Sequence, residues 1–242
     1  EYNKLTEAEK TYSLSNPSGY RISDTVGKRG IEQVMEEELR GKNGLRTVVQ
    51  DQEGNVIRVE ETVEAMIARE NAKAAERLGA DGLLMVTPYY NKATQQGLLR
   101  HYQAIADSVS TPMILYNVPS RTGVNIQPET YAELAQHPNI AGAKEASGSL
   151  SQLQKTMRLC PEDFSIWSGN DDETAAICML GGAGVISVAS NVLPAEMCRL
   201  TALCLANDFA SAGKLQLKLK PLCDALFCEV NPIPVKTALN LM

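Results

Sequence analysis

A lysine at the end of an apolar segment is the residue best suited to covalent chemistry in this sequence. Lys144 closes the run Ile140-Ala-Gly-Ala-Lys144, which predicts a buried strand. Burial at the end of such a strand disfavours the ammonium form of a lysine and lowers its pKa. A neutral amine can attack a ketone and form a Schiff base. Spacing alone leaves a second interpretation open, in which Lys144 forms a buried salt bridge with a neighbouring carboxylate.

Three further residues have side chains that suit the same chemistry. Tyr116 ends the preceding apolar strand, where a phenol can relay protons, although it can equally be an interior aromatic that bonds to the backbone. Arg121 lies in the next loop, and its planar guanidinium suits a carboxylate, although most single loop arginines are simply solvated. Tyr90 belongs to a Pro-Tyr-Tyr-Asn loop, and paired aromatics of this kind often pack at interfaces.

The elements that must position these residues alternate between strand and helix from about residue 60. The predicted strands are Gly82–Thr87, Met113–Asn117, Ile140–Lys144, Phe164–Ser168 and Gly184–Val188. The predicted helices are Gln95–Asp107, Pro128–Gln136, Leu150–Arg158, Asp172–Leu180, Pro194–Ala206, Ala210–Phe227 and Pro234–Leu241. Five apolar strands of this kind, alternating with helices, predict an α/β fold with a parallel sheet and favour a TIM-type (β/α) barrel.

Polar residues gather where the predicted strands end. These segments are Thr87–Lys92, Tyr116–Gly123, Lys144–Gly148, Ser168–Asp172 and Ile186–Asn191. Because sites in parallel barrels lie at the carboxyl ends of the strands, we expect the functional residues there. No strand is followed by a Gly-x-Gly-x-x-Gly motif that opens a helix, so a nucleotide site is not expected.

The N-terminal quarter of the chain has a different pattern, with more charges and more turn residues. A helix is predicted over Ile31–Leu39, followed by a hairpin that joins Leu45–Val49 to Asn55–Val59. A long amphipathic helix is predicted over Glu60–Leu78. We therefore predict a small α+β segment over residues 1–59 and a barrel segment over residues 60–242.

Composition excludes several classes of function. The 242-residue chain has a net charge of −6, which argues against nucleic-acid binding. It has no run of about 18 apolar residues, so no membrane span is expected. Six cysteines without a Cys-x-x-Cys pair predict buried free thiols in a reducing, cytoplasmic setting. Two scattered histidines, His101 and His137, are too few for a metal site.

Residues 66–242 resemble the dihydrodipicolinate synthase family, now called the 4-hydroxy-tetrahydrodipicolinate synthases. The matching motifs are Gly79-Ala-Asp-Gly-Leu-Leu84, Val86-Thr-Pro-Tyr-Tyr-Asn-Lys92, Leu115-Tyr-Asn-Val-Pro-Ser-Arg-Thr-Gly123, Lys144-Glu-Ala-Ser-Gly148, Gly184-Val-Ile-Ser-Val188 and Asn231-Pro-Ile-Pro-Val-Lys236. The resemblance implies a lyase that condenses pyruvate with aspartate semialdehyde in lysine and diaminopimelate biosynthesis. It also implies homo-oligomers.

The resemblance assigns roles to six residues. It implies that Lys144 forms the Schiff base with pyruvate, without a metal or organic cofactor, and that Tyr116 relays protons. It implies that Tyr90 reaches into the site of a neighbouring subunit. Arg121 is implied to receive the carboxylate of aspartate semialdehyde, and Gly169 and Ile186 are implied to line the pyruvate pocket.

Residues 15–58 resemble the dimerisation, or pedestal, region of class B penicillin-binding proteins. The matching motifs are Asp24-Thr-Val-Gly-Lys-Arg-Gly-Ile-Glu32, Glu38-Leu-Arg-Gly41 and Asp51-Gln-Glu-Gly-Asn-Val-Ile57. No Ser-x-x-Lys accompanied by Ser-x-Asn and Lys-Thr-Gly follows, so transpeptidase chemistry is not expected.

The pedestal-like segment stands where the synthase family has its first barrel strands. The Gly-Thr-Thr-Gly-Glu motif of those strands, whose threonines complete the proton relay, is absent from the sequence, and the chain stops short of the family's last helical stretch. We therefore expect a join of two unrelated fragments, an incomplete barrel with two open edges, and a rate lowered by about 10²–10⁴. The alternatives are an inactive chimera and a cell-wall-associated interaction protein that uses the pedestal-like segment.

Overall fold

A computed structural model of the chain describes residues 48–50, 56–59, 63–90 and 92–242. The chain divides into two compact units, Glu1–Val63 and Glu64–Met242. In the first unit, β1 (Val48–Gln50) and β2 (Val56–Val59) pair antiparallel, in agreement with the predicted hairpin. The predicted helix over residues 31–39 and the predicted domain boundary near residue 60 lie outside the described residues and stay predictions.

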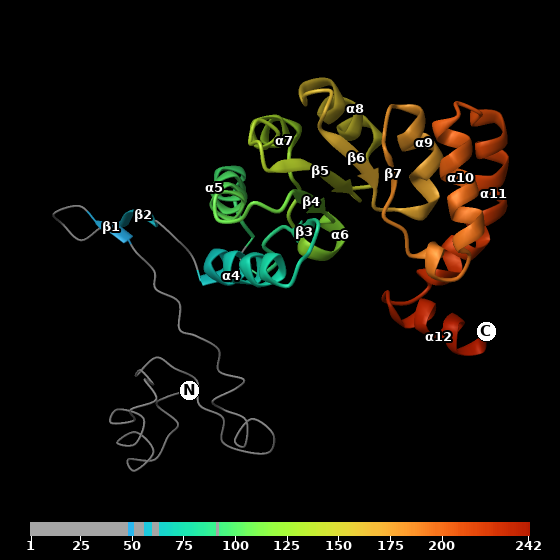
Figure 1. The fold of residues 1–242 in the computed structure, drawn as a ribbon, viewed down its shortest axis with the longest axis horizontal. Helices are drawn as coiled ribbons and strands as arrows, with labels where there is room; N and C mark the ends of the chain where they lie inside the picture. Colours follow the sequence, from blue (N-terminus) through green and yellow to red (C-terminus); the bar gives the residue numbers. More distant parts are fainter. Residues whose placement is uncertain (1–47, 51–55, 60–62, 91) are drawn as a thin grey trace, which may run out of the picture. The chain divides into compact units, whose positions relative to one another are not determined.

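The second unit is built on a five-stranded parallel sheet (Figure 1). The strands are β3 (Leu83–Val86), β4 (Met113–Asn117), β5 (Ile140–Glu145), β6 (Ser165–Ser168) and β7 (Gly184–Val185). Their order in space, β3-β4-β5-β6-β7, is their order along the chain. Among the described residues the sheet does not close on itself, so β3 and β7 are its edges. The five parallel strands and the two open edges confirm the predicted architecture.

Helices alternate with the strands of the sheet, as the sequence predicts. They are α4 (Val63–Arg77), α5 (Gln95–Ala106), α7 (Pro128–Leu134), α8 (Leu150–Leu159) and α9 (Thr174–Met179), the last preceded by the 3₁₀ turn η2 (Asp171–Glu173). Local sequence explains where they begin. The Thr94 hydroxyl accepts the Gly97 N–H at 3.2 Å ahead of α5, and the Ser149 hydroxyl accepts the Gln152 N–H at 3.2 Å ahead of α8.

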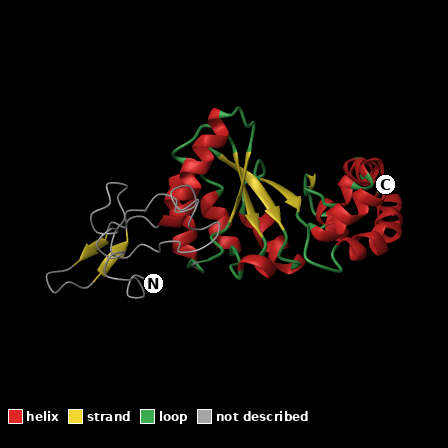
Figure 2. Ribbon diagram, turned by 90° about the horizontal axis from the view of Figure 1, so that it is seen from below, coloured by secondary structure: helices red, strands yellow, loops and turns green. Residues whose placement is uncertain are grey.

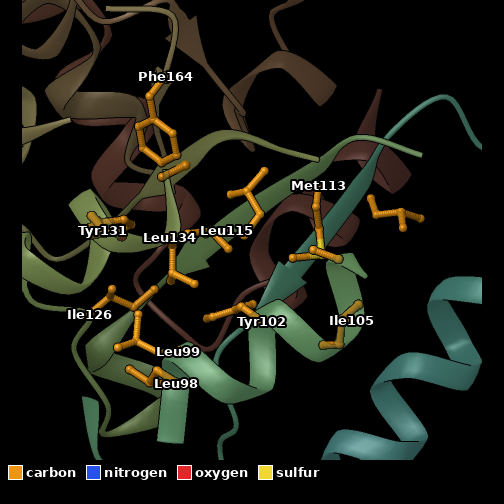
Figure 3. Packing of buried hydrophobic residues seen from close by; sticks show 14 of the residues in the cluster. Leu98, Leu99, Tyr102, Ile105, Met113, Leu115, Ile126, Tyr131, Leu134 and Phe164 are labelled. Atoms are coloured by element: carbon orange, nitrogen blue, oxygen red, sulfur yellow. The ribbon is translucent and has the colours of Figure 1, made fainter. Parts of the chain in front are cut away.

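One face of the sheet packs against these helices to form the main core (Figure 3). Met113, Leu115 and Ala143 point to this face and are fully buried. They meet a set of equally buried side chains from α5, α7 and the segment before α7, namely Leu98, Tyr102, Ile105, Ile126, Tyr131 and Leu134. This face therefore accounts for most of the apolar burial that stabilises the sheet.

The C-terminal helices form a second group, with its own core, beyond β7 (Figure 2). These helices are α10 (Pro194–Leu205), α11 (Phe209–Leu226) and α12 (Ile233–Leu241). Leu200 and Ala212 are fully buried where α10 and α11 pack together. None of the helices in the described ranges is long and apolar enough to cross a membrane.

Three local predictions differ from the structure. The last strand was expected to reach Val188 but ends at Val185, because the chain turns into the 3₁₀ segment η3 (Ala189–Asn191). The short helix α6 (Pro119–Thr122) was expected to be a loop. Of the six free thiols, Cys198 and Cys228 are exposed rather than buried, because both lie on the outer surface of the C-terminal helical region.

Candidate active site

The register of the sheet brings the predicted nucleophile and the predicted proton relay together. Tyr116 of β4 pairs with Lys144 of β5, which in turn pairs with Trp167 of β6. Residues paired in this way point to the same face of a sheet, and this is the face opposite the helix-covered core. The Lys144 Nζ lies 4.4 Å from the centre of the Tyr116 ring, within the range of a cation–π contact.

The surroundings shift the pKa of both side chains. Burial lowers the pKa of Lys144, while the nearby negative charge of Asp171 acts in the opposite direction. Burial raises the pKa of the Tyr116 hydroxyl, and the positive charge of Arg121 partly offsets this rise. Among the ion pairs between described residues, none involves Lys144. A half-buried amine without an ion pair is a competent nucleophile once it loses its proton.

A buried carboxylate anchors the end of β5 from the opposite face. Glu145, the residue after Lys144, is 4% exposed. Its side chain accepts the Tyr131 hydroxyl at 2.9 Å, the Asn117 amide at 3.2 Å and the Ser147 backbone N–H at 2.6 Å. Because several donors surround the carboxylate, it is held in one place, and the strand end that carries Lys144 is held with it.

The same polar network reaches the segment that carries Arg121. The Asn117 side chain donates to Asn125 Oδ1 at 2.8 Å and accepts the Ile126 N–H at 3.1 Å. The Asn125 side chain donates in turn to Gln152 Oε1 of α8 at 2.7 Å. These bonds fix both ends of the segment from β4 to α7, so α6 and the exposed Arg121 project from an anchored loop.

The two residues predicted to line a keto-acid pocket lie at the same end of the sheet. The Gly169 N–H donates to the Glu145 carbonyl at 2.7 Å, and a Cβ at Gly169 would lie 2.6 Å from the Ala146 Cβ. Only glycine therefore allows this close approach. The Ile186 N–H donates to the Ser168 carbonyl at 2.9 Å, which extends the pairing beyond β7.

Tyr90 lies on the surface. It is 85% exposed on the loop after β3. The structure therefore brings Lys144 and Tyr116 into contact, with Gly169 and Ile186 at the same strand ends, and leaves Tyr90 on the surface. The roles implied for all six residues stay predictions.

Sequence reasoning missed two buried acids beside the site. Glu145 is described above, and Asp171 is 3% exposed at the start of η2. Both acids lie in the polar segments at the strand ends that the sequence analysis identified. Their position directly after an apolar strand was the signal that could have marked them as site residues. In the described part of the chain, no group of three or more His, Cys, Asp or Glu side chains is arranged to hold a metal ion.

Comparisons with known proteins identify both parts of the chain. Residues 49–242 match the model of the dihydrodipicolinate synthetase family, and residues 3–70 match that of the penicillin-binding protein dimerisation domain. A 4-hydroxy-tetrahydrodipicolinate synthase of Caldicellulosiruptor bescii is 55% identical over 71% of this chain and 58% of its own length. A relative of the same name from Alkaliphilus oremlandii is 45% identical over 94% of this chain and 78% of its own.

Solved structures agree with the sequence matches. The dihydrodipicolinate synthase of Thermotoga maritima is 47% identical with a TM-score of 0.72, and the match covers 73% of this chain and 61% of that one. The Acinetobacter baumannii enzyme, solved with pyruvate, is 45% identical with a TM-score of 0.71 and the same coverage. The chain spans less than two thirds of the length of the Caldicellulosiruptor relative and of these two structures. By the extent of the family match and these identities, the chain belongs to the dihydrodipicolinate synthetase family.

Proposed function

We propose that this chain condenses pyruvate with aspartate semialdehyde through a Schiff base on Lys144, to give 4-hydroxy-tetrahydrodipicolinate. The observation that carries the proposal is the half-buried Lys144 amine, with its lowered pKa, 4.4 Å from the centre of the Tyr116 ring. The names of the relatives support the reaction, and the pyruvate complex of the Acinetobacter enzyme supports the keto acid.

The first covalent step follows from the chemistry of an amine and a ketone. The neutral Lys144 nitrogen attacks the keto carbon, so a C–N bond forms and the carbonyl electron pair moves to oxygen. One proton moves from nitrogen to oxygen, and a second proton, taken from solvent, lets the oxygen leave as water. The product is an iminium ion with its positive charge on the lysine nitrogen. The Tyr116 hydroxyl is the proposed carrier between nitrogen and oxygen, because its ring contacts the amine.

The remaining residues receive their proposed roles from their places at the strand ends. Gly169 and Ile186 line the keto-acid pocket, and the exposed Arg121 receives the carboxylate of the second substrate. Tyr90 acts at a neighbouring subunit of a homo-oligomer, for which its 85% exposure leaves it available. The match of residues 3–70 to a dimerisation domain supports self-association as a second role for that segment.

Borohydride trapping tests the proposal directly. The full chain is incubated with pyruvate and sodium borohydride, which reduces an iminium to a stable amine, and the modified peptide is identified by mass spectrometry. We expect an adduct on Lys144, no adduct in Lys144→Ala, and an unchanged adduct in Lys155→Ala, which removes an exposed lysine of α8. Turnover is then measured with aspartate semialdehyde.

The outcomes separate the alternatives. A Lys144 adduct together with turnover supports the synthase function. An adduct without turnover restricts the function to imine chemistry and contradicts the full condensation. No adduct in the wild-type chain contradicts the proposal and favours an inactive chimera.

A further inference from the structure

Trp167 lies beside Lys144 on the face of the sheet opposite the helix-covered core. The two residues pair across β5 and β6, so both side chains point to this face. Adjacent strands lie about 4.8 Å apart, which makes the indole and the lysine side chain neighbours where they leave the backbone. Trp167 is the only tryptophan in the sequence, so its fluorescence reports on this one place.

Two glycines show where the indole extends from its strand. A Cβ at Gly142 would lie 2.8 Å from Trp167 Cζ3, and a Cβ at Gly184 would lie 3.7 Å from Trp167 Cδ1. Gly184 is the partner of Trp167 on β7, and Gly142 precedes Lys144 by two residues on β5. Residues two apart in a strand point to the same face. The six-membered ring therefore covers β5 directly on the amino-terminal side of Lys144.

The same indole borders a cavity at the amino ends of β5 and β6. The cavity has a volume of about 560 Å³, and its lining includes Trp167 and the titratable groups His137 and Asp163. Lys144 is not part of this lining. A polar cavity of this size admits water. The indole thus lies between that water and the part of β5 that carries the amine.

The charges around Lys144 do not account for its lowered pKa. Burial lowers this pKa, and the negative charge of Asp171 acts in the opposite direction. Tyr116 faces the amine as a phenol whose own pKa is raised by burial and partly offset by Arg121. Glu145 points to the opposite face, where Tyr131 donates to it. Admission of water should therefore move the pKa of Lys144 upward, toward its ordinary value.

We propose that Trp167 is a positioning residue of the Lys144 site, whose indole forms the floor beneath the amine and separates it from the cavity at the amino ends of β5 and β6. The inference rests on the proposed function, because it concerns the free amine that attacks the keto acid. Exclusion of water from this side disfavours the ammonium ion. A larger fraction of the amine is then neutral and able to react.

The first test measures the pKa of Lys144 without any substrate. The full chain is labelled with acetic anhydride against a reference amine over a range of pH, and the labelled Lys144 peptide is quantified by mass spectrometry. In Trp167→Ala we expect the apparent pKa of Lys144 to rise by about half a unit to one unit, which lowers the neutral fraction about 3- to 10-fold. Trp167→Phe keeps an aromatic ring in place and is expected to stay near the wild-type pKa.

Leu84→Ala provides a matched control. Leu84 lies on the same face of the sheet, on the edge strand β3, and β4 separates it from β5. Its truncation also removes apolar surface from this face and is expected to leave the pKa of Lys144 unchanged. Circular dichroism checks that each variant is folded. If Trp167→Ala does not fold, Trp167→Leu replaces it, because leucine stays apolar but is too short to cover β5.

The second test uses the fluorescence of the single tryptophan. A charge next to an indole shifts its emission, so the emission of the wild-type chain is expected to change with pH at the midpoint found for Lys144 by labelling. Lys144→Met removes the amine and is expected to abolish this step. The variant retains Tyr116 and His137, so steps that arise from other titrating groups remain.

Four results would overturn the inference. They are an unchanged or lower Lys144 pKa in Trp167→Ala, an equal rise in Trp167→Phe, an equal rise in Leu84→Ala, and an emission step that persists in Lys144→Met. Because neither readout involves pyruvate, their failure is distinct from a failure to trap the Schiff base.

Discussion

The two faces of the five-stranded sheet differ in what they contain. On the face toward α5, α7 and α8, Leu115 and Ala143 are fully buried, and the acid Glu145 has several hydrogen-bond donors. On the opposite face Leu84 is 45% exposed, and Lys144 is only partly buried. Successive residues of one strand therefore lie on opposite faces of the sheet, one in the dry core and the next in the partly hydrated site.

The covered face therefore contributes mainly to the stability of the fold, and the open face carries the candidate chemistry. Apolar side chains on the covered face lose their contact with water, and that loss drives folding. The open face holds the poorly compensated Lys144 amine, whose pKa burial lowers. Perturbed ionisable groups of this kind gather at functional sites. Substitutions on the covered face should then unfold the protein, and those on the open face should change its reactivity.

The largest effect is expected from truncating the covered face. Leu115→Ala removes a fully buried side chain between β4 and the helices, and should lower the free energy of unfolding by about 2–5 kcal/mol. The matched change Leu84→Ala, on the other face of the adjacent strand, should cost less than about 1 kcal/mol because that side chain is 45% exposed. Urea unfolding of both variants measures this, and equal losses would contradict the division between the faces.

A smaller effect is expected on the open face, and on rate instead of stability. Tyr116→Phe keeps the ring that contacts the Lys144 amine but removes the hydroxyl. If that hydroxyl carries the proton, adduct formation with pyruvate and borohydride should slow by about 100-fold. The urea midpoint should stay at the wild-type value. A wild-type rate of adduct formation would remove Tyr116 from the mechanism.

The smallest effect is expected from the polar contact between Tyr131 and Glu145 on the covered face. Tyr131→Phe removes the hydroxyl that donates to the buried Glu145 carboxylate, and should lower the free energy of unfolding by about 1–3 kcal/mol. The control Tyr102→Phe loses only a bond to the Met85 carbonyl at 3.3 Å, so it should cost less. Similar losses in the two variants would show that the carboxylate does not need its phenol donor.

The Tyr131 variant also has a pH signature. Burial and the neighbouring Glu145 raise the pKa of the Tyr131 hydroxyl well above its usual value of 10. A group whose pKa is raised by folding stabilises the fold below its unfolded pKa, and this contribution is lost as pH rises beyond it. The wild-type free energy of unfolding should therefore fall above pH 10, and less steeply in Tyr131→Phe. Unfolding curves at two pH values check the difference.

The sequence predicts the sheet well because its strands are short apolar runs with clear limits. Met113–Asn117 was predicted at both ends, since Pro112 precedes the run and Pro119 follows shortly after it. The end of β7 was not predicted, because the turn after it depends on the Asp171 carboxylate, which comes from a different strand end. The short helix α6 escapes prediction because four residues are too few to show a helical period.

The same distinction between local and distant contacts explains which residues of the candidate site could be predicted. Lys144 and Tyr116 could be placed together from sequence because both end neighbouring parallel strands, and the register then sets them side by side. Asp171 was not recognised, because its partners Val188, Ala189 and Gln216 lie far along the chain. Contacts between distant segments leave no local pattern in a sequence.

The agreement between strand order in space and order along the chain bears on how this unit assembles. Each strand pairs with the strand made just before it, from Leu83 with Met113 to Trp167 with Gly184. Contacts between segments close in sequence form quickly, because little loop entropy is lost in closing them. Within this unit every strand pairing therefore joins neighbouring segments of the chain, and none requires a connection longer than one crossover between successive strands.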